Sequence, residues 1–202
     1  MQTQRTRKPA AARKAEIVET AIRLSTEFGP DRLTTERLAR EIGISQAAIF
    51  RHFSTKSQIW LAVGEHIAVK MKTTTALDKN AFEQPLEALR NLLKRQVAFF
   101  EQTPAIPAIM FSQELHAENQ QLRQHVAALL HDRQDIFTRL IKKAQMLGQL
   151  NPELSADDGA ILLLACLQGL AMRWSITAGS FDLVPEGVRL VDMLIDGFGP
   201  AH

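Results

Sequence analysis

Apolar residues recur three and four positions apart along most of this chain, which is the spacing of one face of an α-helix. No segment shows the apolar-polar alternation of a half-buried strand, and there is no internal repeat. The pattern predicts helices near residues 57–77, 85–102, 104–117, 119–147, 156–178 and 185–198, after an amphipathic stripe made by Ile17, Ala21, Leu24 and Phe28. We therefore expect an all-α protein.

Residues 34–56, TTERLAREIGISQAAIFRHFSTK, hold two short helical patterns that meet at a Gly-Ile-Ser turn. Thr34 and Thr35 are candidate caps for the first helix, and Ser45 for the second. Gly43 stands where the first helix ends, because glycine adopts a left-handed backbone without a Cβ penalty. This arrangement is typical of a helix-turn-helix DNA reader.

The second of these helices has an outward face suited to a DNA groove. Ile49 and Phe53 are four apart and point inward, so Arg51 points outward. Ala47 and Ala48 also face outward, and their small size lets the backbone approach the bases. Arg51 is a candidate ligand for a guanine edge or a phosphate. The alternative is an ordinary helical hairpin with one arginine on its solvent side.

Two more residues of this stretch are candidates for DNA contact. Gln46, near the start of the second helix, has the side chain that pairs with adenine. Thr55-Lys56-Ser57-Gln58 has the pattern of a capping box that opens the next helix. A lysine at the first helical position opposes the helix dipole, but a cation beside free N–H groups forms a phosphate clamp. The alternative for Lys56 is a tolerated surface lysine.

Together these motifs resemble the TetR family of bacterial transcriptional regulators. The resemblance covers about residues 14–63 and is carried by the Ile17–Phe28 stripe, Leu33-Thr34-Thr35, Ile42-Gly43-Ile44-Ser45, Ile49-Phe50-Arg51-His52-Phe53 and Lys56. It implies an N-terminal three-helix DNA-binding domain and a C-terminal helical domain for ligand binding and dimerisation. With the outward-facing Ala48 added, the predicted DNA-binding residues are Thr35, Ser45, Gln46, Ala47, Ala48, Phe50, Arg51, His52 and Lys56.

The chain departs from the family pattern within the recognition helix. Phe50 stands where the family usually has a tyrosine, so it has no hydroxyl for a phosphate. Gln46-Ala47 stands where Lys-Gly is usual. We therefore expect weaker phosphate anchoring through this helix and a larger share for Arg51.

Charge divides the chain in the same way as the motifs. Residues 1–72 hold 13 Lys and Arg against 7 Asp and Glu, a net charge of +6, whereas residues 73–202 have a net charge of −4. A basic half is what binding to DNA requires. We expect a basic flexible arm over 1–14, a helix-turn-helix domain over 15–56 and a helical ligand-binding and dimerisation domain over 57–202. The arm either reaches along DNA or is a solubilising tail.

The last two predicted helices are the candidate dimer interface. The 156–178 helix is apolar nearly all round, so it needs cover on both sides. The family resemblance implies a four-helix bundle across a two-fold axis, and the alternative is the core of a monomer. A homodimer would present two recognition helices to a palindromic operator in double-stranded DNA.

A small apolar or amphipathic ligand is expected in the C-terminal domain, where large apolar groups accompany a few polar ones. The predicted ligand-binding residues, each with plain core as its alternative, are Leu93, Gln96, Val97, Phe100, Ile109, Met110, Phe137, Ile141, Cys166 and Trp174. The helix near 57–77 starts at Lys56, so a shift at its far end would move the recognition helix.

Evidence for catalysis or metal binding is lacking in the sequence. Cys166 lies within ILLLACLQGL, which predicts an inert thiol. Glu114, His116 and Glu118 are two apart, so on a helix they do not converge on a metal. No apolar signal segment is found, and the most apolar run, Ala160–Leu167, is too short to span a bilayer. We expect a cytoplasmic ligand-responsive repressor without cofactors, or, as the alternative, a ligand-independent architectural or cell-division factor of the same fold.

Overall fold

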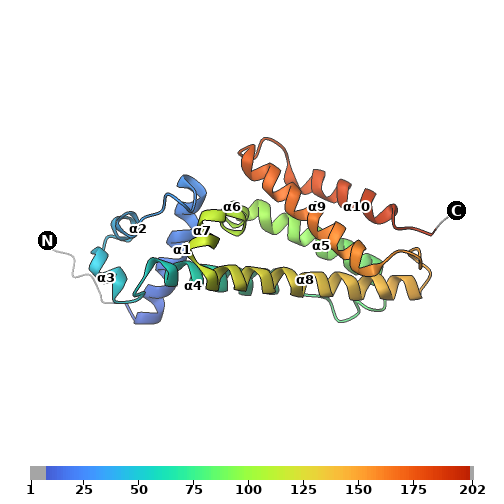
Figure 1. The fold of residues 1–202 in the computed structure, drawn as a ribbon, viewed down its shortest axis with the longest axis horizontal. Helices are drawn as coiled ribbons and strands as arrows, with labels where there is room; N and C mark the ends of the chain where they lie inside the picture. Colours follow the sequence, from blue (N-terminus) through green and yellow to red (C-terminus); the bar gives the residue numbers. More distant parts are fainter. Residues whose placement is uncertain (1–7, 201–202) are drawn as a thin grey trace.

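The computed structural model describes residues 8–200, and none of these residues lies in a β-strand. The helices are α1 (Ala10–Phe28), α2 (Thr35–Ile42), α3 (Gln46–Phe50), α4 (Lys56–Thr74), α5 (Pro85–Gln102), α6 (Ala105–Phe111), α7 (Gln113–Glu118), α8 (Gln120–Met146), α9 (Ala156–Ile176) and α10 (Leu183–Asp196). In Figure 1 the molecule is elongated, with α1–α3 at one end and α9 and α10 toward the other. The predicted all-α fold is confirmed.

A small apolar core holds α1, α2 and α3 together. Ile17, Ala21 and Leu24 of α1 are buried with Leu38 of α2 and Ile49 of α3, and none of the five is more than 2% exposed. A five-residue helix such as α3 is not stable in isolation, so its position is set by this packing. The apolar stripe predicted for the first helix is therefore its buried face.

Helix α4 connects the two halves of the molecule and packs against both α1 and α8. A Cβ added at Gly64 of α4 would lie 2.6 Å from Leu122 Cδ1 of α8, so the two helices cross closely at this glycine. Near the start of α4, Asn119 Nδ2 donates a hydrogen bond of 2.8 Å to the Ser57 carbonyl. The N-terminal end of α8 is thus attached to the first turn of α4.

The C-terminal half is a bundle in which α5 packs on α10 and α8 packs on α9. Its centre is apolar, and Leu92, Phe137 and Leu163 are fully buried. Arg90 of α5 forms ion pairs with Asp192 and Asp196 of α10, the latter at 2.5 Å. These pairs lie at the margin of an interface that is otherwise held by apolar packing.

The largest differences from the predicted helix boundaries occur at two places. The helix expected over 104–117 is interrupted at Ser112, whose backbone is extended (φ −68°, ψ 107°). Ser112 Oγ accepts from Leu115 N and donates to Asp31 Oδ1 at 2.5 Å, so a contact with the N-terminal half accompanies the break. Helix α1 begins at Ala10, within the range expected to be an arm, and Lys8 and Arg13 both pair with Glu16. Residues 1–7 of that arm lie outside the described residues.

Within residues 8–200, α9 is the helix that is long and apolar enough to cross a membrane, judged by length and composition. The sequence prediction considered only the shorter run 160–167. In this fold α9 packs against α8 and α10, and 39% of its most apolar 18-residue window is buried. A core helix of a folded protein can have the same composition as a membrane helix, so length and composition alone do not distinguish the two.

Candidate nucleic-acid interface

The turn between α2 and α3 is built from short-range capping interactions. Thr34 Oγ1 accepts from Arg37 N, and Ser45 Oγ accepts from Ala48 N, both at 3.2 Å. Gly43 has left-handed backbone angles (φ 70°, ψ 41°), which let α2 end and the chain enter α3. The predicted capping role of Ser45 is confirmed, and Thr34 rather than Thr35 caps α2.

The outward face of α3 carries small side chains and, directly after the helix, a cation without an ion-pair partner. Ala47 and Arg51 are exposed, Phe50 is 41% exposed, and Ala48 and His52 are partly buried. Arg51 makes no ion pair with any residue in the described range 8–200. A guanidinium that is exposed and unpaired is available for a phosphate or a guanine edge.

Gln46 has a partner that the sequence did not reveal. Its Nε2 donates to Thr35 Oγ1 at 2.7 Å, and Thr35 is only 8% exposed. This bond fixes the first residue of α2 against the first residue of α3. A bidentate contact with adenine uses both the amide oxygen and the amide nitrogen of a glutamine. Gln46 would therefore have to break its hydrogen bond to Thr35 before it could make that contact.

Lys56 is the first residue of α4, and its side chain is exposed. Thr55 Oγ1 accepts from Gln58 N at 3.2 Å, and Gln58 Oε1 accepts from Ser54 N at 2.9 Å. The cap is therefore reciprocal, although the glutamine bonds one residue earlier than in a standard capping box. The arrangement holds the Lys56 ammonium beside the N-terminal turn of α4, where an anion is also favoured by the helix dipole.

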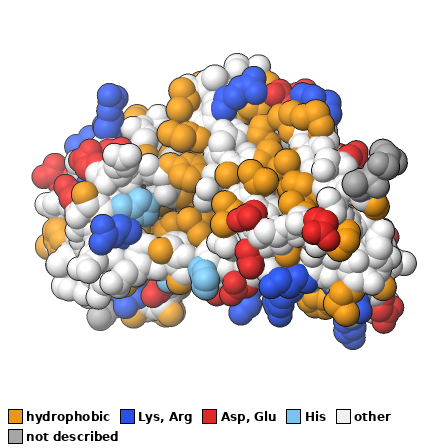
Figure 2. All heavy atoms as spheres, turned by 45° about the vertical axis from the view of Figure 1, so that its right-hand side comes forward, with side chains coloured by type: hydrophobic (Ala, Val, Ile, Leu, Met, Phe, Trp, Pro, Cys, Tyr) orange, Lys and Arg blue, Asp and Glu red, His pale blue; other side chains and the backbone are white. Residues whose placement is uncertain are grey.

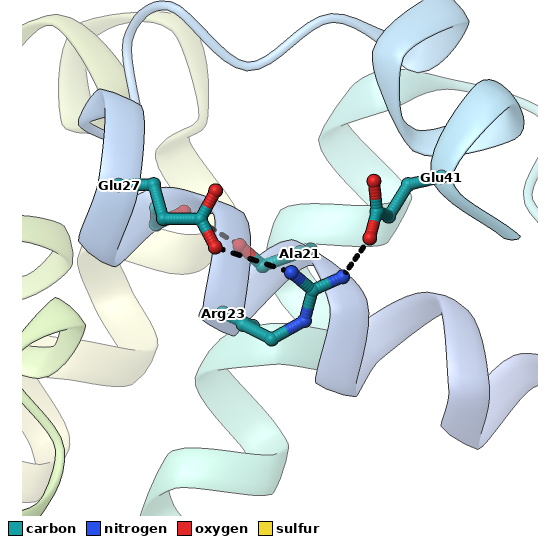
Figure 3. Close-up of polar contacts among 5 residues, drawn as sticks. Ala21, Arg23, Glu27 and Glu41 are labelled. Atoms are coloured by element: carbon teal, nitrogen blue, oxygen red, sulfur yellow. Dashed lines mark hydrogen bonds and ion pairs between the residues drawn. The ribbon is translucent and has the colours of Figure 1, made fainter.

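An arginine of α1 links this helix to α2, the first helix of the helix-turn-helix. Figure 3 shows Arg23 between Glu27 of its own helix and Glu41 of α2, with N–O distances of 3.2 and 2.5 Å. The hydrogen bond to Glu41 raises the pKa of the Arg23 guanidinium. All three side chains are about half exposed, so the pair sets orientation more than stability. Periodicity cannot predict the contact between Arg23 and Glu41, because the two residues are 18 positions apart.

The residues predicted to bind a ligand lie within the C-terminal bundle. Leu93, Gln96, Val97, Phe100, Ile109, Met110, Phe137 and Ile141 are buried, and Cys166 and Trp174 are partly buried. Gln96 Oε1 has no hydrogen-bond partner among the described residues. Trp174 Nε1 donates to the Phe181 carbonyl at 3.1 Å, and burial raises the pKa of the Cys166 thiol. A cavity of about 480 Å³ lies elsewhere, between α4 and α8, and is lined by none of these ten residues.

The described part of the chain contains no group of three or more His, Cys, Asp or Glu side chains placed to hold a metal ion. His116, which the sequence places near two glutamates, instead has Nε2 within 2.8 Å of the Met110 carbonyl. That contact gives the imidazole a structural partner at the junction of α6 and α7.

Comparison with known proteins agrees with this geometry. Residues 17–63 match the model for bacterial regulatory proteins of the tetR family, and residues 85–180 match that for the tetracyclin repressor-like C-terminal domain. The helix-turn-helix and the helical domain behind it are thus both features of one class of transcriptional regulator. The chain belongs to the TetR family, and it is a helix-turn-helix transcriptional regulator.

Several relatives illustrate the range of this family. The chain is 27% identical over 203 residues to the HTH-type transcriptional regulator TtgR of Pseudomonas putida, covering 95% of this chain and 94% of that protein. It is 29% identical over 137 residues to the nucleoid occlusion factor SlmA of Vibrio vulnificus, covering 66% and 69%. One solved structure with the same fold is a TetR regulator of Haloarcula marismortui, with a TM-score of 0.78 and 17% identity, covering 93% of this chain and 98% of that one. Another is SmeT, the repressor of a Stenotrophomonas maltophilia multidrug efflux pump, with a TM-score of 0.71 and 22% identity, covering 92% of this chain and 89% of that one.

Proposed function

We propose that this protein is a cytoplasmic repressor that binds a palindromic operator as a homodimer and releases it on binding a small ligand. The observation that carries the proposal is the pair of exposed, unpaired cations Arg51 and Lys56, at the end of α3 and the start of α4. Cations displayed beside a groove-reading helix provide backbone affinity, and the helix face provides base readout. The proposed contact set is the nine residues predicted from the sequence.

The homodimer is proposed to form through α9 and α10. These helices leave Ile161, Leu162, Met172, Ile176 and Met193 between 48% and 73% exposed in one protomer. Figure 2 shows hydrophobic side chains gathered in a broad area across one face, with charged side chains toward its margins. An apolar area of this kind is typical of a protein interface. Pairing across this area would also cover the exposed apolar side of α9, the helix whose composition resembles that of a membrane helix.

Ligand response is proposed to act through α4. This helix begins at Lys56 and is attached to α8 by the Asn119–Ser57 hydrogen bond and by the close crossing at Gly64. A ligand that moves α8 against α4 would therefore change the placement of the recognition helix. In a dimer, such a movement takes the two recognition helices away from the separation of roughly 34–36 Å that successive major grooves demand.

The test of this function is the selection of genomic fragments by the purified full-length protein at near-physiological salt. A few sites that share one palindrome are expected, and the Arg51→Ala, Lys56→Ala double variant should recover none of them. A variant at a distant exposed cation, Lys94→Ala, should select the same sites as the unchanged protein. Selection of fragments without a common palindrome would contradict the proposal.

A second candidate function is that of a ligand-independent architectural or cell-division factor. The observation that favours it is the 29% identity to a nucleoid occlusion factor over 137 residues. Such a protein would bind many dispersed sites, ignore metabolites and contact another protein. The same selection experiment separates the two functions, since dispersed sites whose occupancy no small molecule changes would favour the second.

A further inference from the structure

Arg133 of α8 is a buried cation without a carboxylate partner. Arg133 is only 5% exposed, and its Nη2 donates a hydrogen bond of 2.6 Å to Thr75 Oγ1. Nε and Nη1 have no hydrogen-bond partner among the described residues. Burial lowers the pKa of the guanidinium, although an arginine stays charged at neutral pH. A buried charge whose hydrogen-bonding groups lack partners lowers the stability of the fold, and such a group in a native structure indicates a function.

This arginine forms part of the wall of the cavity between α4 and α8. The cavity has a volume of about 480 Å³, and Val69, Leu77, Leu129 and Ile136 contribute to its apolar wall. This volume and lining are those of a site for a small organic molecule. His125 also lines the cavity, and its Nε2 is buried and unpartnered like the two nitrogens of Arg133. Unsatisfied nitrogen groups thus belong to residues that line an open, largely apolar pocket.

We propose that this cavity binds an organic carboxylate with an apolar body, whose carboxylate is held by Arg133. This inference rests on the proposed ligand response and names the chemical class of the ligand. The apolar body would lie against the aliphatic wall, and the carboxylate would supply the charge and the hydrogen-bond acceptors that Arg133 lacks. Charge-assisted bonds between a guanidinium and a carboxylate are the strongest type available to this side chain.

The charges at the edge of the cavity are compatible with an anion. Three exposed charged side chains line it, namely the cations Lys72 and Arg139 and the anion Asp132. Asp132 is not within ion-pair distance of Arg133, but its exposed carboxylate still attracts the guanidinium and partly opposes the effect of burial on its pKa. Two cations against one anion leave the entrance net positive before Arg133 is counted.

The position of Arg133 also connects the cavity to α4. Its present partner Thr75 follows the last residue of α4, and Thr75 Oγ1 donates to the Met71 carbonyl at 2.7 Å. Because Nε and Nη1 are closed off from solvent, Arg133 must turn toward the cavity to meet a carboxylate. That turn removes a contact from the C-terminal end of the helix that begins at Lys56.

Isothermal titration calorimetry on the full-length protein tests the ligand class. The probes are straight-chain carboxylates from hexanoate to dodecanoate and 2-naphthoate, each paired with the alcohol of the same carbon skeleton. At least one carboxylate should bind tenfold or more tighter than its alcohol. Arg133→Met, which keeps an unbranched side chain, should abolish that preference, while Arg123→Met, an exposed arginine of the same helix, should retain it. A preference that survives Arg133→Met, or no carboxylate binding at all, would overturn the proposal.

Two further measurements keep the test decisive. Arg133→Met should melt at a temperature equal to or above that of the unchanged protein, because it removes a buried guanidinium two of whose nitrogens lack hydrogen-bond partners. If that variant fails to fold, Leu129→Trp fills the cavity and leaves Arg133 in place, and it should lose binding of the carboxylate and the alcohol together. Operator binding without ligand is measured in parallel. If the unchanged protein binds its operator but none of the carboxylates, only this inference is refuted. If it shows Arg133-dependent carboxylate binding but no operator binding, only the proposed function is refuted.

Discussion

At the scale of single residues, the proposed DNA contact rests on two exposed cations in different settings. Arg51 directly follows α3 on the face that also exposes Ala47, whereas Lys56 stands in the first turn of α4. The first is placed to reach bases or backbone, and the second only backbone. Their replacement by alanine should therefore have different effects on affinity and on specificity.

Lys56→Ala should weaken binding to all DNA sequences alike. The variant loses one phosphate contact, so the slope of log affinity against log salt should fall by about one unit. Fluorescence anisotropy at several salt concentrations measures this slope, with Lys94→Ala as the control for a lost positive charge at a distance. A slope that does not change would remove Lys56 from the phosphate contacts.

Arg51→Ala should lower affinity for the selected operator, and its effect on base variants identifies the contact. If Arg51 meets a guanine edge, discrimination at one position should fall by roughly 1–3 kcal/mol, whereas a phosphate contact changes all variants equally. Binding is measured on the operator and on its single-base variants. Unchanged affinity for every variant would exclude Arg51 from the interface.

At the scale of helices, the features that the sequence predicted are those determined by neighbouring residues. The cap at Ser45 and the stop at Gly43 depend on contacts within a few positions, and both are present in the structure. The contacts Gln46–Thr35 and Arg133–Thr75 join residues 11 and 58 positions apart. Such contacts depend on how helices pack, which periodicity does not specify.

The close crossing of α4 and α8 leads to a prediction about Gly64. Val at this position would place side-chain atoms against Leu122, so it should destabilise the protein by about 1–3 kcal/mol through overpacking. Ala127→Val on the exposed side of α8 is the control for valine's helix propensity, and it should cost about 0.5 kcal/mol. Urea denaturation gives both values. Helix propensity alone favours valine over glycine, so a Gly64→Val variant at least as stable as the unchanged protein would show that Leu122 moves aside without penalty.

For the whole molecule, the unexplained feature of a single protomer is the apolar surface that α9 and α10 leave exposed. The alternation of exposed and buried residues along α9 shows that it is covered on one side only, with Leu163 and Leu167 buried and Ile161 and Leu162 about half exposed. The sequence predicted an all-round apolar helix but not which side is left open. That side is decided by the packing of α8 and α10.

Disruption of this surface should separate dimerisation from folding. Ile176 and Met193 are 73% and 62% exposed, so glutamate at both positions should be tolerated by a monomer and repelled across a dimer interface. Sedimentation equilibrium should show a shift from dimer to monomer, with helicity by circular dichroism unchanged. Met146→Glu, at an equally apolar residue that is 78% exposed on α8, should leave the dimer intact.

The same double variant should weaken operator binding far more than the loss of any single contact. A dimer binds its second half-site as an intramolecular event, and this linkage contributes roughly 10²–10⁴-fold to affinity. A monomer keeps the contacts of Arg51 and Lys56 but loses that factor, so binding to an isolated half-site should be nearly unchanged while binding to the full palindrome falls. Monomers that bind the full palindrome as tightly as the unchanged protein would show that α9 and α10 do not bring the two recognition helices together.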